Sequence, residues 1–433
     1  MSVSFRHYSN FEKHYRKKSA TVINAIITRK AKQEFARLMQ FENGGSPKIN
    51  SGDSKKLPLL YIHIPFCEKL CPYCSFHRVV FDGALCHNYF KALRGEIMLY
   101  KDKGYDFGGI YVGGGTPTIL IEELEETLEL AGQCFSIRQI SVETNPNHLT
   151  EENIAVLKRA GVNRLSVGVQ SFDDQLLRNM DRYEKYGSGE IVARRLSQTL
   201  GHFDTLNADM MFNFPSQTMT MLDRDMDILL DIGIDQITYY PLMVSDSTRQ
   251  QVREKFGHVD YRKEEQFYHR IVERLMPAYR HSSAWCFSKN AVMIDEYIVD
   301  YDEYAGLGSG SIGYLNGTCY ANTFNIEEYI TRVSRREIPI MAFRGFRPED
   351  QLRYDFLMKL FGMKMDIPAS QKKYGGIFYR ALWFNILAFS LAGALHYRSP
   401  CFHLTKRGCY LWVIMMREFF IAVNNFRDFC RPR

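Results

Sequence analysis

The chain has 433 residues, of which 45% are hydrophobic and 24% charged, a balance that excludes a disordered or fibrous protein and indicates a globular one with a large core. The net charge of +6 is unevenly distributed: residues 1–40 hold nine Lys and Arg against two Asp and Glu, residues 371–433 hold ten against two, and the part between them is net acidic. Basic ends of this kind suit an anionic membrane surface, and ordinary solvated charge is the alternative.

Ten cysteines are present, and three of them fall within residues 67–74. The other seven are scattered without a pairing pattern, which argues against a disulfide framework and indicates a reducing compartment. They are Cys86, Cys134, Cys286, Cys319, Cys401, Cys409 and Cys430. No secretion signal is recognisable at Met1, so we expect a cytoplasmic protein or one held peripherally at the inner face of the membrane.

Residues 1–41 are predicted to form a basic amphipathic extension of one or two helices. Aromatic and apolar side chains recur there at helical spacing, first Tyr8, Phe11 and Tyr15 and then within residues 22–27. Such a helix lies either in a membrane interface or on the main domain, and the sequence leaves both possibilities open. Residues 42–56, which are rich in Gly, Ser, Asn and Lys, are a predicted linker.

From residue 59 onward the sequence alternates short β-rich runs with longer helical patterns. Strands are predicted at 59–64, 109–113, 139–143, 164–168, 206–211 and 236–240. Six parallel strands with helices between them predict an α/β fold with fewer strands than a closed eight-stranded barrel. Ligands of such sheets bind at the carboxyl ends of the strands, so the motifs that follow each strand are the candidates for chemistry.

Three cysteines follow the first predicted strand, with the spacing C-x3-C-x2-C: Cys67, Cys71 and Cys74. Thiolates are soft ligands that suit iron-sulfur clusters or zinc. A closed zinc site takes four protein ligands, whereas three thiolates leave one iron of a 4Fe-4S cluster open for a further ligand. The spacing therefore predicts a catalytic 4Fe-4S cluster. A zinc knuckle and a set of buried structural cysteines are the alternatives.

The segment Tyr61-Ile-His-Ile-Pro-Phe-Cys67-Glu-Lys-Leu-Cys71-Pro-Tyr-Cys74 resembles the signature of the radical S-adenosylmethionine (radical SAM) enzymes, in the family related to oxygen-independent coproporphyrinogen oxidase. The resemblance implies a partial (β/α)6 barrel over residues 57–245. It also implies a 4Fe-4S cluster with one open iron site and two molecules of S-adenosylmethionine (SAM). Within the family, the chain is most similar to the class C methyltransferases of the menaquinone C8-methyltransferase type.

The resemblance further implies SAM-binding residues at strand and helix ends. The turn Gly113-Gly114-Gly115-Thr116 matches the segment that binds the methionine amino group, since missing Cβ atoms let backbone approach a ligand; a tight βα connection is the alternative. Four polar side chains match residues that hold the SAM hydroxyls and carboxylate, although each alone is more commonly a cap or surface residue: Glu143, Gln170, Arg182 and Asp209. The planar arginine fork suits a carboxylate. Tyr61, the predicted catalytic residue, is expected near the second SAM or the substrate.

Two further units are predicted after the barrel strands. Residues 246–345 are expected to complete the barrel and to carry a Gly-rich substrate-side loop, because four glycines fall within residues 306–313; an ordinary loop with turn glycines is the alternative. Residues 346–433 are expected to form a small, mostly helical domain. The uncharged apolar run 381–395 is shorter than the ~20 residues that span a bilayer. It is either a core helix or an apolar wall for a lipophilic substrate.

The activity predicted from the resemblance is that of a radical SAM methyltransferase. The cluster would reduce one SAM to a 5′-deoxyadenosyl radical, this radical would take hydrogen from the methyl group of a second SAM, and the new carbon radical would add to an sp2 carbon of the substrate. The basic ends and the apolar C-terminal region favour a membrane-held aromatic substrate, and menaquinone is the leading hypothesis. Contact with an anionic membrane, a low-potential electron donor of the flavodoxin or ferredoxin type and no nucleic-acid partner are expected.

Three other activities compete with menaquinone methylation. They are anaerobic haem opening with methyl transfer, oxidative decarboxylation of coproporphyrinogen, and a non-catalytic haem chaperone. Phe76 stands where the family has the second cysteine of a C-x-C pair, and this departure argues against simple coproporphyrinogen oxidation while leaving cluster binding intact.

Overall fold

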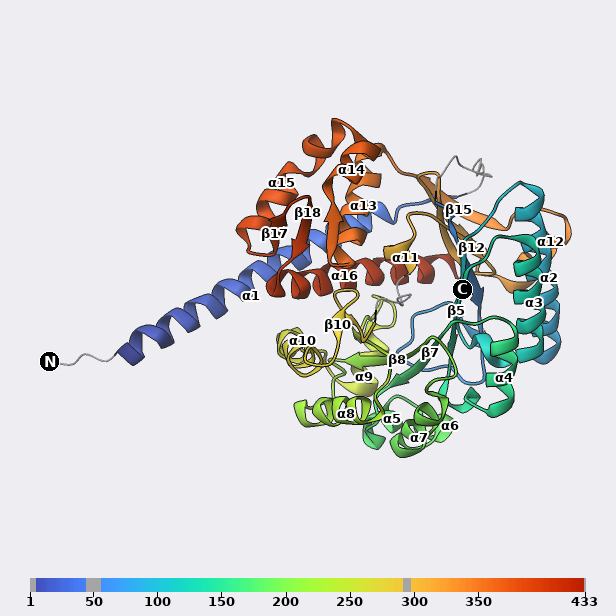
Figure 1. The fold of residues 1–433 in the computed structure, drawn as a ribbon, viewed down its shortest axis with the longest axis horizontal. Helices are drawn as coiled ribbons and strands as arrows, with labels where there is room; N and C mark the ends of the chain where they lie inside the picture. Colours follow the sequence, from blue (N-terminus) through green and yellow to red (C-terminus); the bar gives the residue numbers. More distant parts are fainter. Residues whose placement is uncertain (1–4, 44–55, 291–296, 432–433) are drawn as a thin grey trace.

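The computed structural model describes residues 5–43, 56–290 and 297–431, and for residues 5–21 and 43 it describes the backbone only. One mixed sheet of thirteen strands forms the centre of the protein, with the strand order β1-β15-β14-β13-β12-β2-β5-β6-β7-β8-β9-β11-β10 (Figure 1). Its central strands are β2 (Leu59–Ile64), β5 (Gly109–Gly114), β6 (Gln139–Thr144), β7 (Arg164–Gln170), β8 (Thr205–Phe212) and β9 (Gln236–Pro241).

The six predicted strands are confirmed, each with ends at most two residues from the predicted ones. They lie side by side in chain order and are all parallel. A seventh parallel strand, β12 (Tyr304–Leu307), was not predicted and pairs with the free edge of β2. The α/β class and the partial barrel are therefore confirmed, with antiparallel strands added at both edges of the parallel sheet.

Burial on both faces explains why the strands read as continuous apolar runs. Every residue of β2 and of β8 is buried, because side chains fill the barrel on one face and helices cover the other. The covering helices are α2 (Gly83–Asp102), α3 (Ile121–Cys134), α4 (Glu151–Arg159), α7 (Gly189–Thr199), α8 (Met219–Ile232) and α10 (Tyr261–Leu275). Polar N-caps start several of them, as where the Asp82 carboxylate accepts from the amide of Leu85 at 2.8 Å.

The predicted Gly-rich loop is in fact a β-hairpin over most of its length. Strand β12 is followed by β13 (Ile312–Leu315), and the two pair antiparallel through Tyr304 and Tyr314. The close approach that the glycines permit is to the protein itself: a Cβ on Gly308 (φ 93°) would lie 2.5 Å from the carbonyl oxygen of His63. These glycines are therefore required by packing, and most of the expected irregular loop is a hairpin. Its role on the substrate side stays a prediction.

The remaining edge strands extend the sheet on both sides. They are β1 (Glu42–Asn43), β14 (Thr318–Asn322), β15 (Ile340–Gly345), β10 (Arg280–His281) and β11 (Cys286–Ser288). Because β1 pairs with β15, the predicted linker begins with two strand residues; residues 44–55 of that linker lie outside the described residues.

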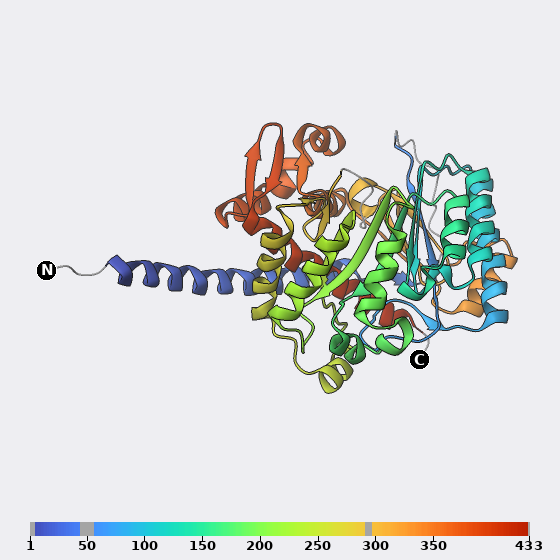
Figure 2. The same cartoon turned by 60° about the horizontal axis from the view of Figure 1, so that its bottom comes forward.

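The C-terminal region is mostly helical, as predicted, but it also contains a small antiparallel sheet that the sequence did not suggest (Figure 2). Its helices are α13 (Pro348–Phe361), α14 (Ile367–Tyr374), α15 (Ile377–Leu391) and α16 (Lys406–Cys430). Its strands, in spatial order, are β16 (Lys364–Asp366), β18 (Cys401–Leu404) and β17 (Leu395–Arg398). None of the helices in the described part of the chain is long and apolar enough to cross a membrane.

The N-terminal extension is a single helix, α1 (Phe5–Leu38), rather than two. Its second half packs on the domain: Ala31, Phe35 and Leu38 are buried, and the rings of Phe35 and Phe419 of α16 meet edge to face at 5.5 Å. For this half, the alternative of a helix laid on the main domain is the one observed. The side chains of Tyr8, Phe11 and Tyr15 lie outside the described part of the structure, so an interfacial role for the first half stays a prediction.

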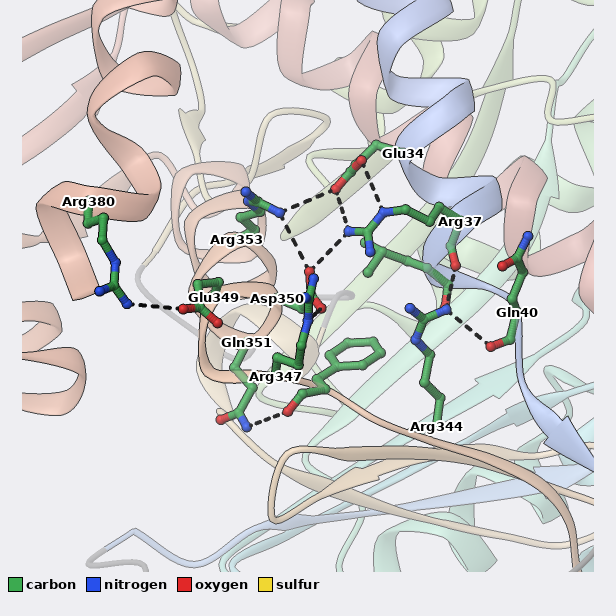
Figure 3. Close-up of polar contacts among 12 residues, drawn as sticks. Glu34, Arg37, Gln40, Arg344, Arg347, Glu349, Asp350, Gln351, Arg353 and Arg380 are labelled. Atoms are coloured by element: carbon green, nitrogen blue, oxygen red, sulfur yellow. Dashed lines mark hydrogen bonds and ion pairs between the residues drawn. The ribbon is translucent and has the colours of Figure 1, made fainter.

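Ion pairs fix the end of α1 to α13 (Figure 3). The Arg37 guanidinium is 2.7 Å from Glu34 Oε1 and 3.0 Å from Asp350 Oδ1. The Asp350 side chain is buried, and Arg347 and Arg353 approach it as well, at 3.2 and 3.6 Å. A buried carboxylate surrounded by three guanidinium groups anchors the helix better than exposed pairs do.

Candidate functional site

The three cysteines lie on one loop that leaves the barrel directly after β2. Cys67 ends the short strand β3 (Phe66–Cys67), which pairs with β4 (Val79–Val80), and it is buried. Cys71 and Cys74 are half-buried, and the amide of Cys74 donates to the carbonyl of Cys71 at 3.2 Å. Arg78 closes the loop by donating to the carbonyl oxygens of Cys71, at 2.6 Å, and Cys74. The loop is therefore a compact unit with its thiols on a preformed backbone.

The glycine turn after β5 touches this loop. A Cβ on Gly115 would lie 2.9 Å from the Cys67 sulfur and 2.6 Å from the carbonyl oxygen of Phe66, so only glycine fits there. The next residue, Thr116, directs its hydroxyl at the Cys67 sulfur, at 3.8 Å, and accepts a hydrogen bond from the Asn145 amide at 2.9 Å. Two predicted residues of the turn are thus in contact with a predicted cluster ligand.

The donor set fits a cluster better than a single metal ion. In the described part of the chain, no three Cys, His, Asp or Glu side chains converge on one ion position. A 4Fe-4S cluster needs no such convergence, because each thiolate binds a different iron and the sulfurs stay apart. Three thiols on one loop therefore suit a cluster with an open iron, and they do not form the four-ligand shell of structural zinc.

Charges around the loop favour an anionic group there. Burial, and next the neighbouring Cys74, raise the pKa of the Cys67 thiol to about 11, so bound iron must displace a proton from this sulfur. Arg182 Nη1 lies 3.7 Å from the Cys71 sulfur. Burial opposes the charge of Arg78, but attraction to Cys74 and Cys71 outweighs it and raises the pKa of this guanidinium. Both arginines stay charged beside the thiolates.

Glu143 lies against the glycine turn. Its Oε2 accepts from the amide of Gly114 at 3.2 Å, and its Oε1 accepts from the Tyr111 hydroxyl at 2.9 Å. A Cβ on Gly113 would lie 2.8 Å from Oε1, and a Cβ on Gly114 (φ 122°) would lie 2.8 Å from the His63 ring. The ends of β5 and β6 thus bring the predicted glycines and the predicted carboxylate together in one polar cradle beside Cys67.

Gln170 and Arg182 lie at the end of β7, where Arg182 also contacts the cysteine loop at Cys71. Gln170 has φ 73°, and its side chain accepts from the Tyr240 hydroxyl at 2.9 Å. Arg182 is buried and donates to the Gly168 carbonyl and, at 3.4 Å, to the Tyr73 hydroxyl. Its Nε has no partner, and no described carboxylate forms an ion pair with it. A buried, unpaired guanidinium is suited to an incoming carboxylate.

Asp209 is buried on β8, but the protein itself supplies its partners. Ser166 donates to Oδ2 at 2.9 Å and Asn207 donates to Oδ1 at 2.7 Å. We expected a ligand hydroxyl or ammonium to be the partner that this buried carboxylate needs. The structure removes that argument, and a SAM-binding role for Asp209 stays a prediction that rests on the resemblance.

Tyr61 points into the barrel from β2 and belongs to an aromatic cluster. Its hydroxyl lies 2.9 Å from His63 Nδ1, and its ring stacks on Tyr297 at 5.4 Å and an interplanar angle of 22°. Burial raises the pKa of the Tyr61 phenol, and burial lowers the pKa of His63 to about 3. Both groups are therefore neutral at physiological pH. Neutral Tyr61 can donate or accept a hydrogen bond, and its predicted catalytic role is untested by this geometry.

One charged group at the site was missed by the sequence analysis. Arg427, near the end of α16, is buried and interacts electrostatically with Tyr61 and Tyr297. Its guanidinium lies over the Phe76 ring at 4.8 Å. From the sequence, the arginines of residues 371–433 were counted only as part of a basic end suited to an anionic surface. The 366 positions between Tyr61 and Arg427 carry no local pattern that pairs these two residues.

An open groove of about 690 Å³ lies on the outer side of the cysteine loop. Cys71 and Cys74 line it, and its far wall belongs to α9 (Arg249–Phe256). Three basic residues and one acidic residue contribute to the lining: Arg78, Lys255, Arg431 and Glu254. The groove is a route by which a partner can approach the cysteine loop without entering the barrel.

The fold and this constellation define a radical SAM protein. Residues 61–188, which contain the cysteine loop, the glycine turn, Glu143, Gln170 and Arg182, match the model of the radical SAM superfamily. The superfamily implies a 4Fe-4S cluster and SAM, and both suit the thiols and the polar cradle described above.

Comparison with known proteins narrows the class. The haem chaperone HemW of Lactococcus lactis is 30% identical over 280 residues, which cover 62% of this chain and 73% of that protein. HemW of Bacillus subtilis is 29% identical over 365 residues, 80% of this chain and 95% of that protein. The solved structure of coproporphyrinogen III oxidase (HemN) from Escherichia coli, a radical SAM enzyme, is similar with a TM-score of 0.70 at 18% identity, covering 87% of this chain and 96% of that one. The chain belongs to the radical SAM superfamily and, within it, to the HemN-like family that includes HemW.

Proposed function

We propose that this protein is a haem-binding radical SAM protein similar in function to HemW. The observation that carries the proposal is the similarity to HemW along 95% of the Bacillus subtilis protein, which includes the segment with the cysteines and the SAM cradle. Menaquinone methylation, the leading hypothesis from the sequence, has weaker support, because none of the relatives described above carries a quinone name. It becomes an alternative outcome of the tests below.

In this proposal, the chain's own residues bind and orient SAM beside the cysteine loop. Cys67, Cys71 and Cys74 hold the cluster, whose chemistry when SAM is bound is the reductive generation of a carbon radical. The backbone of Gly114 and the Glu143 carboxylate, 3.2 Å apart, form the polar edge that suits a methionine ammonium. The unpaired guanidinium of Arg182 suits the methionine carboxylate. Cys67 and Arg182 are buried, whereas Cys71, Cys74, Gly114 and Glu143 are half-buried.

Haem titration under anaerobic conditions tests the proposed function. Cluster-reconstituted protein is mixed with increasing haem, and the Soret absorbance is followed. Saturable binding with a shifted Soret band is the expected result. Absence of saturable haem binding, together with methylation of a menaquinone analogue in the presence of SAM and reductant, would overturn the haem proposal and restore the quinone one.

SAM-dependent methyl transfer to the bound ligand is the second candidate function. The observation that favours it is the presence of two buried guanidinium groups without a described carboxylate partner, Arg182 and Arg427, each of which can take one methionine carboxylate. On this basis we propose two SAM molecules per chain. Equilibrium dialysis of the reconstituted protein is expected to give a stoichiometry of two, and one would contradict the two-SAM proposal. Label from [methyl-14C]SAM in recovered haem would establish the transfer.

For the electron donor we propose approach through the open groove beside Cys71 and Cys74. Its basic lining suits an acidic flavodoxin- or ferredoxin-type protein, and association between such surfaces weakens as salt rises. Lys255→Glu, on the groove wall, is expected to slow cluster reduction by flavodoxin several-fold without changing reduction by dithionite. Equal slowing with both reductants would argue against docking in the groove.

A further inference from the structure

We propose that Arg427 of α16, which contacts the cysteine loop at Phe76, binds a carboxylate of the ligand that occupies the barrel. The identity of that ligand rests on the proposed function, in which it is haem with its two propionates. The second source of the same chemistry is the methionine carboxylate of a second SAM. The experiment below separates the two sources.

Hydrogen bonds hold the end of α16 on the cysteine loop, and they fix the position of Arg427 relative to that loop. In Figures 1 and 2 this red helix runs from the C-terminal region to the sheet. Arg431 donates to the carbonyl of Ser75 at 3.0 Å and to that of Phe76, and it pairs with Asp428 at 2.9 Å. One turn earlier, the Arg427 guanidinium stacks on the Phe76 ring. Phe76 is the residue at the family's second-cysteine position, so this departure provides the platform for the arginine.

Arg427 is a buried charge that the described residues do not neutralise. Its relative exposure is 8%. Nη1 donates to Asn424 Oδ1 at 3.0 Å, whereas Nε has no partner, and no carboxylate of the described residues forms an ion pair with this guanidinium. Burial, and then repulsion from Arg431, lower the pKa of Arg427. Proteins rarely bury a charge without a counter-charge, because the desolvation penalty is several kcal/mol.

Among the described groups that act on Arg427, the phenols and imidazoles of the barrel supply no counter-charge, whereas the Cys74 sulfur, a proposed cluster ligand, attracts it. Tyr61 and Tyr297 are the phenols that interact with it, and burial raises the pKa of both, so both are neutral at physiological pH. His63 and His77 also feel its charge, and burial lowers their pKa values, so neither adds a charge of either sign. Arg427 is therefore a buried cation beside neutral aromatic rings, with a second cation, Arg431, one turn further along α16.

This environment has the features of a site for a ligand that combines a flat apolar group with a carboxylate. Aromatic rings provide an apolar wall, and the guanidinium fork provides bidentate recognition of a carboxylate. Haem combines an apolar macrocycle with two propionates, and SAM combines a base with a methionine carboxylate. A bound carboxylate from either ligand would neutralise the Arg427 guanidinium. Because the unpaired charge destabilises the ligand-free site, its neutralisation would strengthen ligand binding.

Esters and decarboxylated ligands distinguish the two sources. We measure the affinity of each protein for haem, haem dimethyl ester, SAM and decarboxylated SAM. The proteins are the wild type, Arg427→Gln and the control Arg407→Gln. The control removes an exposed arginine from the other end of the same helix. For the wild type and the control we expect roughly 10- to 100-fold weaker binding of the ligand without its carboxylate, as for a charged hydrogen-bonded pair. For Arg427→Gln this preference is expected to vanish.

The pattern of the preferences decides the outcome. Loss of the haem preference alone assigns Arg427 to a propionate, and loss of the SAM preference alone assigns it to a methionine carboxylate. If both preferences persist in Arg427→Gln, the inference is wrong. If the wild type binds no haem, the proposed function fails, and the SAM comparison alone decides the role of Arg427.

Stability of the ligand-free protein gives an independent readout. Arg427→Met keeps the packing on Phe76 and removes the charge, so the thermal midpoint of the ligand-free protein is expected to rise by a few degrees. Saturating ligand should then stabilise the variant less than the wild type. A fall of several degrees in the ligand-free variant would show that the chain already neutralises Arg427, and this would overturn the inference.

A second and independent inference concerns the exposed face of α15. We infer that this face rests on an anionic membrane surface. Four large apolar side chains lie on one side of the helix at a spacing of three or four residues and are 48 to 80% exposed: Trp383, Phe384, Leu387 and Leu391. Residues 367–417 contain seven Lys and Arg and no Asp or Glu, but Arg417, Lys373 and Arg380 pair with acidic residues outside this range. Four exposed basic residues form no ion pair with a described residue: Lys372, Arg398, Lys406 and Arg407. Exposed aromatic and apolar side chains together with these four basic residues match the chemistry of an anionic lipid interface.

Vesicle flotation tests this face against the alternative of self-association. The full chain is mixed with vesicles of phosphatidylcholine containing 30% phosphatidylglycerol, or with phosphatidylcholine alone. Wild type and Met276→Glu, an exposed apolar control at the end of α10, are expected to float with the anionic vesicles at low salt. Trp383→Glu/Leu387→Glu is expected to lose most of this binding. Unchanged flotation of the double variant, or a wild-type dimer that the double variant dissociates, would overturn the membrane assignment.

Discussion

The Glu143 carboxylate and the backbone of Gly114 lie 3.2 Å apart, on neighbouring strands whose ends meet beside Cys67. The contact exists because the positions on β5 that face Glu143 lack side chains. It joins the cysteine loop, the glycine turn and the polar cradle into one site. Changes to any of the three are therefore expected to affect ligand binding in separable ways.

Gly113→Ala is expected to weaken SAM binding while leaving the cluster in place. The new Cβ would lie 2.8 Å from Glu143 Oε1, and the flexible end of that side chain can move away without unfolding the sheet. We expect roughly 10-fold weaker SAM binding, equivalent to one lost charged hydrogen bond. Dialysis with labelled SAM measures this, and the iron content serves as the control. Unaltered SAM affinity would show that Glu143 is not a ligand-binding group.

Cys67→Ala, Cys71→Ala and Cys74→Ala are each expected to abolish the cluster. Iron should fall from about four per chain to below one, with loss of the brown absorbance, because each thiolate binds its own iron. Cys134→Ser, on a half-buried cysteine of α3 outside the loop, is the matched control and should keep its iron. Iron content at the wild-type level in any loop variant would contradict the assignment of that cysteine.

Arg182→Lys tests whether the guanidinium fork itself is needed. Lysine keeps the positive charge but cannot bind a carboxylate bidentately, so SAM affinity is expected to fall roughly 10- to 100-fold. The control is Arg178→Gln, which removes an exposed arginine from the preceding helix. A fall in the thermal midpoint with unchanged SAM affinity would indicate that Arg182 only supports the Gly168 carbonyl and Tyr73, its partners in the ligand-free site.

Stability is expected to fall between pH 5 and pH 8 because of Glu96. Burial raises the pKa of this carboxyl to about 7, although Tyr329, Gly308 and Asn322 donate to it. Since the folded pKa lies above the unfolded value of about 4.3, the stabilising contribution is complete below pH 4.3 and is lost as the pH rises through 7. The loss is up to roughly 3 kcal/mol.

Glu96→Gln should flatten this pH dependence, and thermal unfolding at pH 5 and pH 8 measures it. Part of the slope is expected to remain, because burial also raises the pKa of Asp225 to about 7. An identical pH profile for the variant and the wild type would show that Glu96 titrates at its ordinary pKa.

Arg37→Ala is expected to loosen the end of α1 without affecting the site. The Asp350 carboxylate keeps Arg347 and Arg353, so the loss should be modest, about 1 kcal/mol. Hydrogen exchange of residues 22–38 should become faster, while SAM binding stays at the wild-type level. Slower or unchanged exchange would mean that the contact between Phe35 and Phe419 alone holds the helix.

The sequence predicted the parts of the fold that depend on local pattern. The six parallel strands follow from β-rich runs between helical segments, and the cysteine loop follows from its spacing. Strand β12 was missed because Tyr304-Ala-Gly-Leu has too little β-rich character to stand out among glycines. It forms a strand because the free edge of β2 accepts it, and such pairing is set by tertiary contact rather than by propensity.

The residues of the candidate site could also be predicted only where a local sequence motif identifies them. Cys67, Gly115, Thr116 and Glu143 were all named from motifs, and the structure brings them into contact or within one residue of contact. Arg427 could not be predicted in this way, because the sequence around it contains no motif that indicates contact with the barrel. The partners of Asp209 were also hidden, since they come from a neighbouring strand and from the same strand two residues away.

The attachment of α16 to the cysteine loop joins residues that are 356 positions apart, Ser75 and Arg431. During synthesis, the strands and helices of the barrel leave the ribosome long before α16 does. The loop therefore stays uncovered on that side for as long as the ribosome needs to add the intervening chain, roughly 20 to 70 seconds at 5 to 20 residues per second. The carbonyls of Ser75 and Phe76 gain their partner Arg431 only when α16 docks, so this side of the loop is completed last.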